Sequence, residues 1–345
     1  AFASGTYDTG GAAAEEVTVS CEYVAKRGEF EKHYLLSDGS FVAVSYPEAI
    51  HYRNADGEWE DIDSSLHAEA SSSRIVTGDC GTFAASFSTG RRAGRLVSLS
   101  NREFSLSWSL SGDGDRIVSS SPVLAASSSS VMQARAKISD SITGKPVSDS
   151  ETFALRGASG SVGYSALFAD APEISAEYTV YRNKIEEDIY INSPTDLRSL
   201  RMEFDTAGLT AEVRDDGSVE FLDENGEMRF RIGIPYMEDA ANEILTDIHV
   251  NAEQNGDSCT VTYTPDEEWL SSSERSYPIL FDPSVTTDEY NSNIVDTYVA
   301  EGDTANHSGE QKLFYGVKSG KVHRVYIKIN NLPALDPSMP VYGAT

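Results

Sequence analysis

Carboxylates are the side chains of this sequence with the greatest capacity for chemistry. The 345 residues include 55 Asp and Glu against 27 Lys and Arg, so the formal net charge is −28 at pH 7. Two runs, Asp113–Asp115 and Asp223–Glu227, place carboxylate oxygens on short turns. Oxygen ligands suit Ca²⁺, yet neither run has the spacing of an EF-hand loop, and both resemble ordinary hairpin turns. We interpret both runs as structural turns, expect no cofactor, and keep Ca²⁺ as the alternative.

The other groups that perform catalysis do not form a recognisable constellation. The six histidines are scattered and show neither HxH nor HExxH spacing. Gly157–Gly160 comes nearest to the Gly-x-Ser-x-Gly elbow of hydrolases but lacks its spacing. Glycosidases need two carboxylates across a cleft, and among 55 acids some pair meets that distance by chance. The sequence therefore predicts a protein that is not an enzyme, with a carbohydrate-active enzyme as the remaining catalytic alternative.

Tyrosines are the candidates for ligand recognition. Glycan-binding surfaces present aromatic rings on a strand face or a loop tip, and Tyr178, Tyr181 and Tyr190 lie in one strand-rich stretch. Tyr178 is in phase with Val180, whereas Tyr181 points to the other face. We single out Tyr181 and Tyr290 as the ligand-binding candidates. Cross-strand packing is the alternative explanation for either ring.

Alternating hydrophobic residues indicate the elements that must position these side chains. In residues 196–264 apolar and polar residues alternate in short runs that are separated by Gly-containing turns, a pattern typical of antiparallel hairpins. A sustained helical period is absent from the sequence, although 236–246 could hold one helical turn and 131–138 is compatible with helix or strand. We predict an all-β protein of antiparallel β-sandwich domains with hairpin meanders and little helix.

Composition suggests four segments. Residues 1–14 are small and polar and are expected to be flexible, and 15–175 should form a β-sandwich domain with Ser- and Gly-rich loops. Residues 176–285 should form an antiparallel meander or sandwich. Residues 286–345 are too few for such a domain, so we expect the rest of it to lie outside these residues.

Cysteine usage and charge limit the partners. The chain has no CxxC motif; Cys259 is in phase with apolar neighbours and should be buried, and a Cys21–Cys80 bridge stays open. The negative charge repels phosphate backbones and anionic lipids, and no apolar run reaches the roughly 20 residues of a membrane span. We expect a monomer without a nucleic-acid partner and without membrane insertion.

Several motifs resemble a known family. Asp296–Val299, the Gly316 turn, Arg324–Ile329 and Leu332–Leu335 are similar to the opening of a DNRLRE domain. Residues 34–46, 51–63 and 269–283 resemble the N-terminal β region of large exported wall-associated proteins of Gram-positive bacteria, many of which carry YD (RHS-type) repeats. No YD repeat is present here, and residues 111–175 match no motif of that family. The resemblance implies an extracellular, cell-surface or cell-wall-associated module and assigns no catalytic residue.

Patterning and resemblance together predict a non-enzymatic, adhesin-like surface module. Its partner would be a host glycoprotein, a mucin glycan or a secreted immunoglobulin, recognised by side chains or through a free strand edge. The alternative is a structural stalk or shell segment of a larger YD-repeat or toxin protein with no ligand of its own. The sequence does not identify the ligand or locate its surface.

Overall fold

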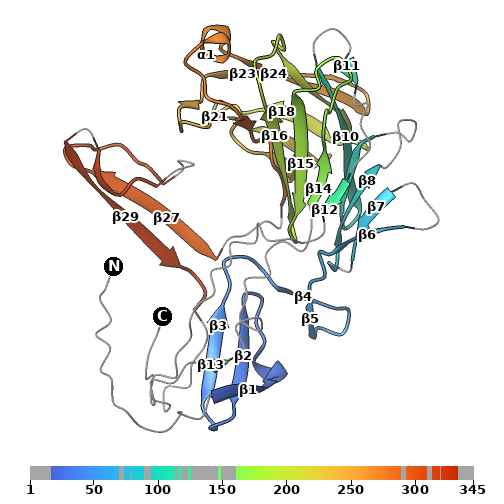
Figure 1. Ribbon diagram of the computed structural model, residues 1–345. Helices are drawn as coiled ribbons and strands as arrows, with labels where there is room; N and C mark the ends of the chain where they lie inside the picture. Colours follow the sequence, from blue (N-terminus) through green and yellow to red (C-terminus); the bar gives the residue numbers. More distant parts are fainter. Residues whose placement is uncertain are drawn as a thin grey trace. The chain divides into compact units, whose positions relative to one another are not determined.

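The computed structural model describes residues 17–69, 74–78, 80–88, 95–112, 116–117, 123–125, 147–148, 161–288, 293–308, 313–318 and 320–332. The regular secondary structure of these residues is almost entirely β-strand, which confirms the predicted all-β class (Figure 1). The described helices are α1 (Glu267–Ser271) and one 3-10 turn, Val24–Lys26. Within the described residues, no helix has the length and apolar character that crossing a membrane requires.

The chain forms two compact units, and each is assembled from separate stretches of sequence. The first unit takes in described residues from 1–51, 132–155 and 292–345, and the second takes in described residues from 52–131 and 156–291. The sequence suggested contiguous segments with a boundary at 175. In the structure the second unit runs through this point, because strands on both sides of it pair in the same sheet.

One sheet of the second unit has nine strands. Its order is β23-β24-β17-β10-β9-β8-β7-β6, and β11 pairs with β10. The bounds are β6 (Leu66–Ala68), β7 (Arg74–Thr77), β8 (Phe83–Ser88), β9 (Val97–Asn101), β10 (Phe104–Gly112), β11 (Arg116–Ile117), β17 (Leu200–Asp205), β23 (Ile248–Asn255) and β24 (Ser258–Pro265).

The other sheet of this unit has eleven strands. Its order is β12-β14-β15-β16-β26-β20-β19-β18, and β25 lies between β16 and β21, which also pairs with β22. The bounds are β12 (Val123–Ala125), β14 (Ser161–Tyr164), β15 (Ile174–Val180), β16 (Lys184–Ile191), β18 (Thr210–Val213), β19 (Val219–Leu222), β20 (Met228–Ile232), β21 (Met237–Asp239), β22 (Ile244–Leu245), β25 (Ile279–Phe281) and β26 (Val285–Thr287).

The two sheets enclose a common core. Strict alternation puts one face of each strand inside, as in β15 and β16, where every second residue is buried. Aromatic rings meet across the core: Phe204 lies 4.9 Å from Phe221, and Tyr263 lies 5.2 Å from Phe281, between ring centroids. Cys259 is buried among them, as its phase predicted. These contacts make the second unit a β-sandwich.

A recurring loop closes several hairpins. In the β19–β20 hairpin Asp223 accepts hydrogen bonds from the backbone N–H groups of Asn225 at 2.8 Å and Glu227 at 3.0 Å. Gly226 takes a φ of 79°, a left-handed conformation that glycine adopts without steric cost. The side-chain oxygen thus satisfies turn donors that the ladder leaves unpaired.

The same loop corrects the expected helical turn at 236–246. Asp239 accepts from the backbone N–H groups of Ala241 and Glu243, and Asn242 supplies the left-handed position with a φ of 66°. Asn is the residue other than Gly that tolerates this conformation best. The segment is therefore the β21–β22 hairpin.

The first unit holds two smaller sheets. One has the order β13-β1-β2-β3 and the other the order β27-β29-β28. Buried Asn293 connects them, since its side-chain amide donates to the Tyr46 carbonyl at 3.0 Å and accepts from the Asn331 N–H at 2.7 Å. The bounds are β1 (Val17–Glu22), β2 (Glu31–Leu36), β3 (Phe41–Ser45), β13 (Val147–Ser148), β27 (Ile294–Ala300), β28 (Gly316–Lys318) and β29 (Lys321–Ile329). A two-stranded sheet of β4 (His51–Arg53) and β5 (Trp59–Asp61) completes the described strands.

Candidate functional site

Strand β16 carries carboxylates on both of its faces and is the strongest candidate site among the described residues. Its odd-numbered residues point into the sandwich and its even-numbered residues point outward. Glu187 therefore lies in the core between Ile185 and Ile189, and no part of its surface is exposed. Glu186 and Asp188 lie on the outer face.

Glu187 is held by two neutral donors from different strands. The Trp108 Nε1–H donates to one carboxyl oxygen at 3.1 Å, and the Tyr178 hydroxyl donates to the other at 2.7 Å. Trp108 lies on β10, so the first bond links the two sheets across the core. Burial raises the pKa of Glu187 to about 8, although both hydrogen bonds act in the opposite direction. The group is consequently mostly protonated at neutral pH.

A third polar group adjoins this pair. The Tyr263 hydroxyl is buried and has no hydrogen-bond partner among the described residues. Burial raises the pKa of Tyr263, and the nearby Glu187 raises it further. No lysine, arginine or histidine of the described residues makes an ion pair with Glu187. The core thus contains a carboxyl group with hydrogen bonds and no counter-charge.

On the outer face, three carboxylates converge. One oxygen each of Glu186, Asp188 and Asp282 lies within 4.8 Å of the others. Asp282 directly follows β25, and Pro283 interrupts the strand pairing that continues into β26. Because β16 pairs with β25 and then with β26, this interruption faces Asp188.

The crowding changes the chemistry of Asp188. Its pKa is raised to about 7, first by burial and then by the charges of Glu186 and Asp282. The Tyr190 hydroxyl donates to it at 3.4 Å, and the ion pair recorded in this cluster joins Lys184 to Glu186 at 3.6 Å. Asp188 is therefore poised to exchange a proton close to neutral pH.

Hard oxygen donors of this kind are the ligands that divalent cations such as Ca²⁺ and Mg²⁺ use in proteins. Among the described residues, Glu186, Asp188 and Asp282 form the group that could hold one. The hydroxyl of Tyr236 donates to Asp282 at 3.5 Å, and Ser284 donates to the same carboxylate through its backbone N–H at 3.0 Å. Asp282 thus already has three protein donors when its Ser284 hydroxyl contact is included.

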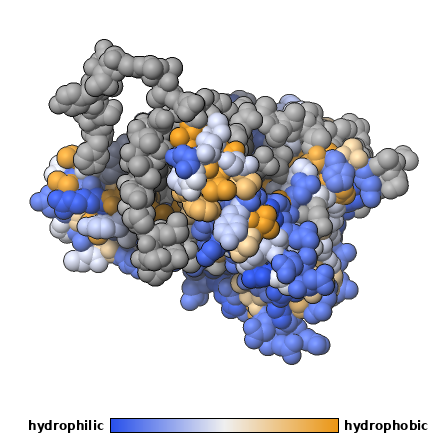
Figure 2. Space-filling model, turned by 90° about the horizontal axis from the view of Figure 1, so that it is seen from below, coloured by the Kyte–Doolittle hydropathy of each residue, from blue (hydrophilic) through white to orange (hydrophobic). Residues whose placement is uncertain are grey.

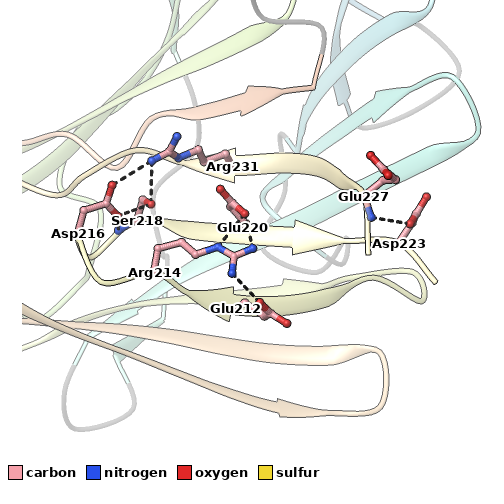
Figure 3. Close-up of polar contacts among 8 residues, drawn as sticks. All are labelled: Glu212, Arg214, Asp216, Ser218, Glu220, Asp223, Glu227 and Arg231. Carbon is pink, nitrogen blue, oxygen red and sulfur yellow. Dashed lines mark hydrogen bonds and ion pairs between the residues drawn. The ribbon is translucent and has the colours of Figure 1, made fainter. Parts of the chain in front are cut away.

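The outer face of β18, β19 and β20 is also rich in acids, but here arginines pair with them (Figure 3). Arg214 donates to Glu212 at 2.8 Å and to Glu220 at 2.8 Å. Arg231 donates to Asp216 at 3.1 Å and to the Ser218 hydroxyl at 3.0 Å. This face is a ladder of cross-strand ion pairs.

The Asp223–Glu227 run belongs to the same ladder. Arg229 donates to Asp223 at 2.6 Å, and its other nitrogen donates to Asp288 at 3.0 Å. The hydrogen bond from Arg229, together with the backbone donors of Glu227 and Asn225, lowers the pKa of Asp223 to about 2. The run is a structural turn whose oxygens are already used, as expected. The other turn considered for Ca²⁺, Asp113–Asp115, lies outside the described residues.

The tyrosines selected from the sequence do not form a site. Tyr181 is half-buried, and the Lys184 ammonium lies 5.6 Å from its ring centroid. Tyr290 lies outside the described residues. Tyr178 is in the core, bonded to Glu187. The three cysteines are all free thiols, so Cys21 and Cys80 are not bridged.

Sequence reasoning overlooked Glu187. The signal was present, because a charged residue stood in phase with Ile185 and Ile189 on a strand that was otherwise clearly two-sided. Asp188 carried no such signal, since its pKa depends on Asp282, which lies almost a hundred residues further along the chain.

Comparison with known proteins finds relatives of this chain. It is 24% identical over 353 residues to the tRNA(Glu)-specific nuclease WapA of Bacillus subtilis subsp. natto, and matches the tRNA nuclease WapA of B. subtilis strain 168 equally well. The tRNA3(Ser)-specific nuclease WapA of Bacillus spizizenii also shares 24% identity. Each match covers 96% of this chain but only 14% of the relative. No family model matches the chain.

These names correct one conclusion of the sequence analysis. The lack of a catalytic signature led to the expectation that the protein is not an enzyme, and that expectation is wrong because the relatives are named as nucleases. Their names also specify tRNA, which weighs against the expected exclusion of nucleic acid. The reasoning failed because motifs were sought in a region that spans about one-seventh of the relatives' length, since the chain covers 14% of them.

Proposed function

We propose that this chain is part of a large exported, wall-associated protein of the WapA type that acts on tRNA, and that its sheets form a rigid β platform within that protein. The observation that carries the proposal is similarity along 96% of the chain to proteins named as tRNA nucleases. A surface or extracellular location is part of the same proposal.

The structure supports the platform role through its packing. The two sheets of the second unit share one continuous core, and the ladder of Arg214, Arg229 and Arg231 braces the outer face of β18–β20. Nearly every inward-facing aromatic ring is fully buried. A close-packed core of this kind is of low compressibility, which suits a part that displays or spaces other segments.

The test is an assay of the full-length polypeptide that contains these residues. We expect the purified protein to cleave tRNA and to be recovered in the cell-wall fraction of the organism that makes it. A protein that leaves tRNA intact and stays inside the cell would contradict the proposal. The 345-residue chain, assayed in parallel, shows whether the activity needs residues other than these.

The adhesin-like function predicted from the sequence remains a prediction. Host glycoprotein, mucin glycan and immunoglobulin have no supporting observation in this structure. Tyr181, the candidate that the structure describes, is half-buried, and the Lys184 ammonium lies 5.6 Å from its ring centroid. Binding of the chain to immobilised mucin or immunoglobulin, compared with a Tyr181→Ala variant, tests this second function directly.

A further inference from the structure

The exposed hydrophobic residues of this chain are concentrated in one small sheet. Of the fourteen large hydrophobic side chains that are exposed in the described residues, nine lie between 295 and 332. Hydrophobic patches interrupt the hydrophilic surface in the view of Figure 2. The nine are Val295, Val299, Tyr315, Val317, Val322, Tyr326, Ile327, Ile329 and Leu332. A concentration of this kind marks an interaction surface.

The two faces of the β27-β29-β28 sheet differ in how they are covered. On one face Tyr298 is buried, because His307 stacks on its ring at 4.1 Å and Phe314 meets it edge-on at 5.3 Å. These two rings therefore cover part of this face. Ile327 and Ile329, on the same face, are exposed.

On the opposite face, here called the open face, no aromatic ring of the described residues covers the strands in this way. Residues directly opposite in antiparallel strands share a face, and the register places Val299 opposite Arg324, Val295 opposite Lys328, and Val317 opposite Val322. Tyr326 lies between the two cations on β29. The valines and this tyrosine are between 38% and 73% exposed.

Arg324 and Lys328 give the open face its charge. Neither side chain makes a hydrogen bond or ion pair with any residue that the structure describes. Residues 311–330 contain five Lys and Arg and no Asp or Glu, in a chain where acids outnumber bases by 55 to 27. Two cationic side chains without an ion pair lie among exposed valines. They fit a partner that presents aliphatic side chains and carboxylates together on the surface facing them.

We propose that the open face docks a further antiparallel β segment of the same longer polypeptide, which packs aliphatic residues on the valines and places carboxylates opposite Arg324 and Lys328. This inference rests on the proposed function, because the relatives extend far beyond the matched region, which is 14% of their length. Sheets with one apolar face are stable when a second layer covers that face.

A second copy of this chain fits the open face less well. In a symmetric dimer each copy presents the same patch, so Arg324 and Lys328 of one copy would face the same cations of the other. Like charges brought together in an apolar contact oppose association. The charge pattern therefore favours an acidic partner over self-association.

The test measures thiol labelling at Val299→Cys in a Cys21→Ser background, in the full-length polypeptide and in the 345-residue chain. We expect labelling to be at least about tenfold slower in the full-length polypeptide, because docking covers the open face. Val213→Cys is the matched control: Val213 is 39% exposed on β18 of the other unit and should label equally in both proteins. Equal labelling at Val299→Cys in both proteins would overturn the proposal.

Charge variants identify the partner's chemistry. Arg324→Glu with Lys328→Glu should restore fast labelling at Val299→Cys in the full-length polypeptide, whereas Lys321→Glu, on the opposite face of β29, should not. Unchanged protection in the double variant would overturn the acidic partner. Protection in the 345-residue chain that appears only as its concentration rises would overturn the proposal in favour of a second copy. Because these readouts do not involve tRNA, loss of nuclease activity and loss of docking remain distinguishable.

Discussion

Two acidic surfaces of the second unit have opposite electrostatics. On the face of β18–β20, Asp223 meets Arg229 and its pKa falls to about 2, whereas on β16 Asp188 meets Glu186 and Asp282 and its pKa rises to about 7. The residue type is the same, so the difference comes from the neighbours and from burial. The cross-strand register, which decides the neighbours of each carboxylate, therefore sets its pKa more than the composition of the chain does.

The comparison extends to the core. Glu187 occupies the inner face of the same strand as Asp188 and likewise lacks a cation, yet two neutral donors hold it. Protonation satisfies Glu187 without a counter-charge, while the ladder residues depend on remaining charged. One sheet thus combines carboxyl groups that favour the neutral form with carboxylates that favour the ionised form.

The largest expected effect comes from removing the Trp108 ring, which packs in the core and donates to Glu187. Trp108→Ala should cost about 3–5 kcal/mol of unfolding free energy through the cavity and the lost hydrogen bond. Trp108→Phe keeps most of the volume and should cost less, about 1–3 kcal/mol, because one carboxyl oxygen loses its donor. Urea denaturation of both variants separates the two effects. A Trp108→Phe variant as stable as the unsubstituted protein would show that the hydrogen bond contributes nothing.

The pH dependence of Glu187 should be the next largest effect. Its pKa rises from 4.5 to about 8 on folding, so the folded state binds more protons than the unfolded state between these values. The stability that Glu187 contributes should be greatest below about pH 4.5 and fall by several kcal/mol up to about pH 8, because one pKa unit corresponds to about 1.4 kcal/mol. Glu187→Gln should flatten this profile in denaturation at pH 5 and pH 9. If stability changed with pH in the same way in Glu187→Gln and in the unsubstituted protein, Glu187 would not be a buried group that titrates in this range.

Neutralising one acid on each surface should change the stability of the protein in opposite directions. The pKa of Asp188 is raised on folding, so its ionisation destabilises the fold as pH increases from 4 towards 7, and Asp188→Asn should stabilise the protein by about 1 kcal/mol at pH 8. Glu220→Gln removes one of the two carboxylate partners of Arg214 and should destabilise the protein. Melting in chelator keeps trace cations away from the cluster. If Glu220→Gln stabilised the protein, the contrast between the Asp188 cluster and the ion-paired face of β18–β20 would be wrong.

The smallest effect should come from exposed pairs. Arg198 and Glu267 form an ion pair at 3.1 Å with both side chains largely exposed, and Arg198→Gln should change stability by less than about 0.5 kcal/mol. Arg229→Gln leaves Asp223 and Asp288 without their shared cation and should lower the melting temperature more than Arg198→Gln does. The effect should shrink as pH falls towards the lowered pKa of Asp223. Identical melting temperatures for the two variants would show that the ladder is no stronger than a surface pair.

Much of the fold was predictable because local patterns carry it. Alternation in residues 196–264 predicted β18, β19, β20, β23 and β24, and the Asp-Gly and Asn-Gly pairs marked the turns between them. The β21–β22 hairpin was mistaken for a helical turn because its left-handed residue is Asn242 instead of Gly. Pairings between distant strands, such as β10 with β17 and β16 with β25, have no local signature.

The candidate site was less predictable for the same reason. Glu187 could be inferred to point inward, but its donors Trp108 and Tyr178 come from two other strands. The cluster around Asp188 depends on Asp282 arriving from β25, a contact that spacing along the chain does not reveal. Tyr181 was selected because it points to the face opposite Tyr178; in the structure it is half-buried, with the Lys184 ammonium 5.6 Å from its ring centroid.

The most direct test of the contrast between the two surfaces is an NMR titration of Asp side-chain carboxyl carbons, assigned with Asp188→Asn and Asp223→Asn variants. The account predicts that Asp188 titrates near pH 7 and Asp223 near pH 2 in the same folded protein. Titration of both groups close to the ordinary Asp value of about 3.9 would contradict it.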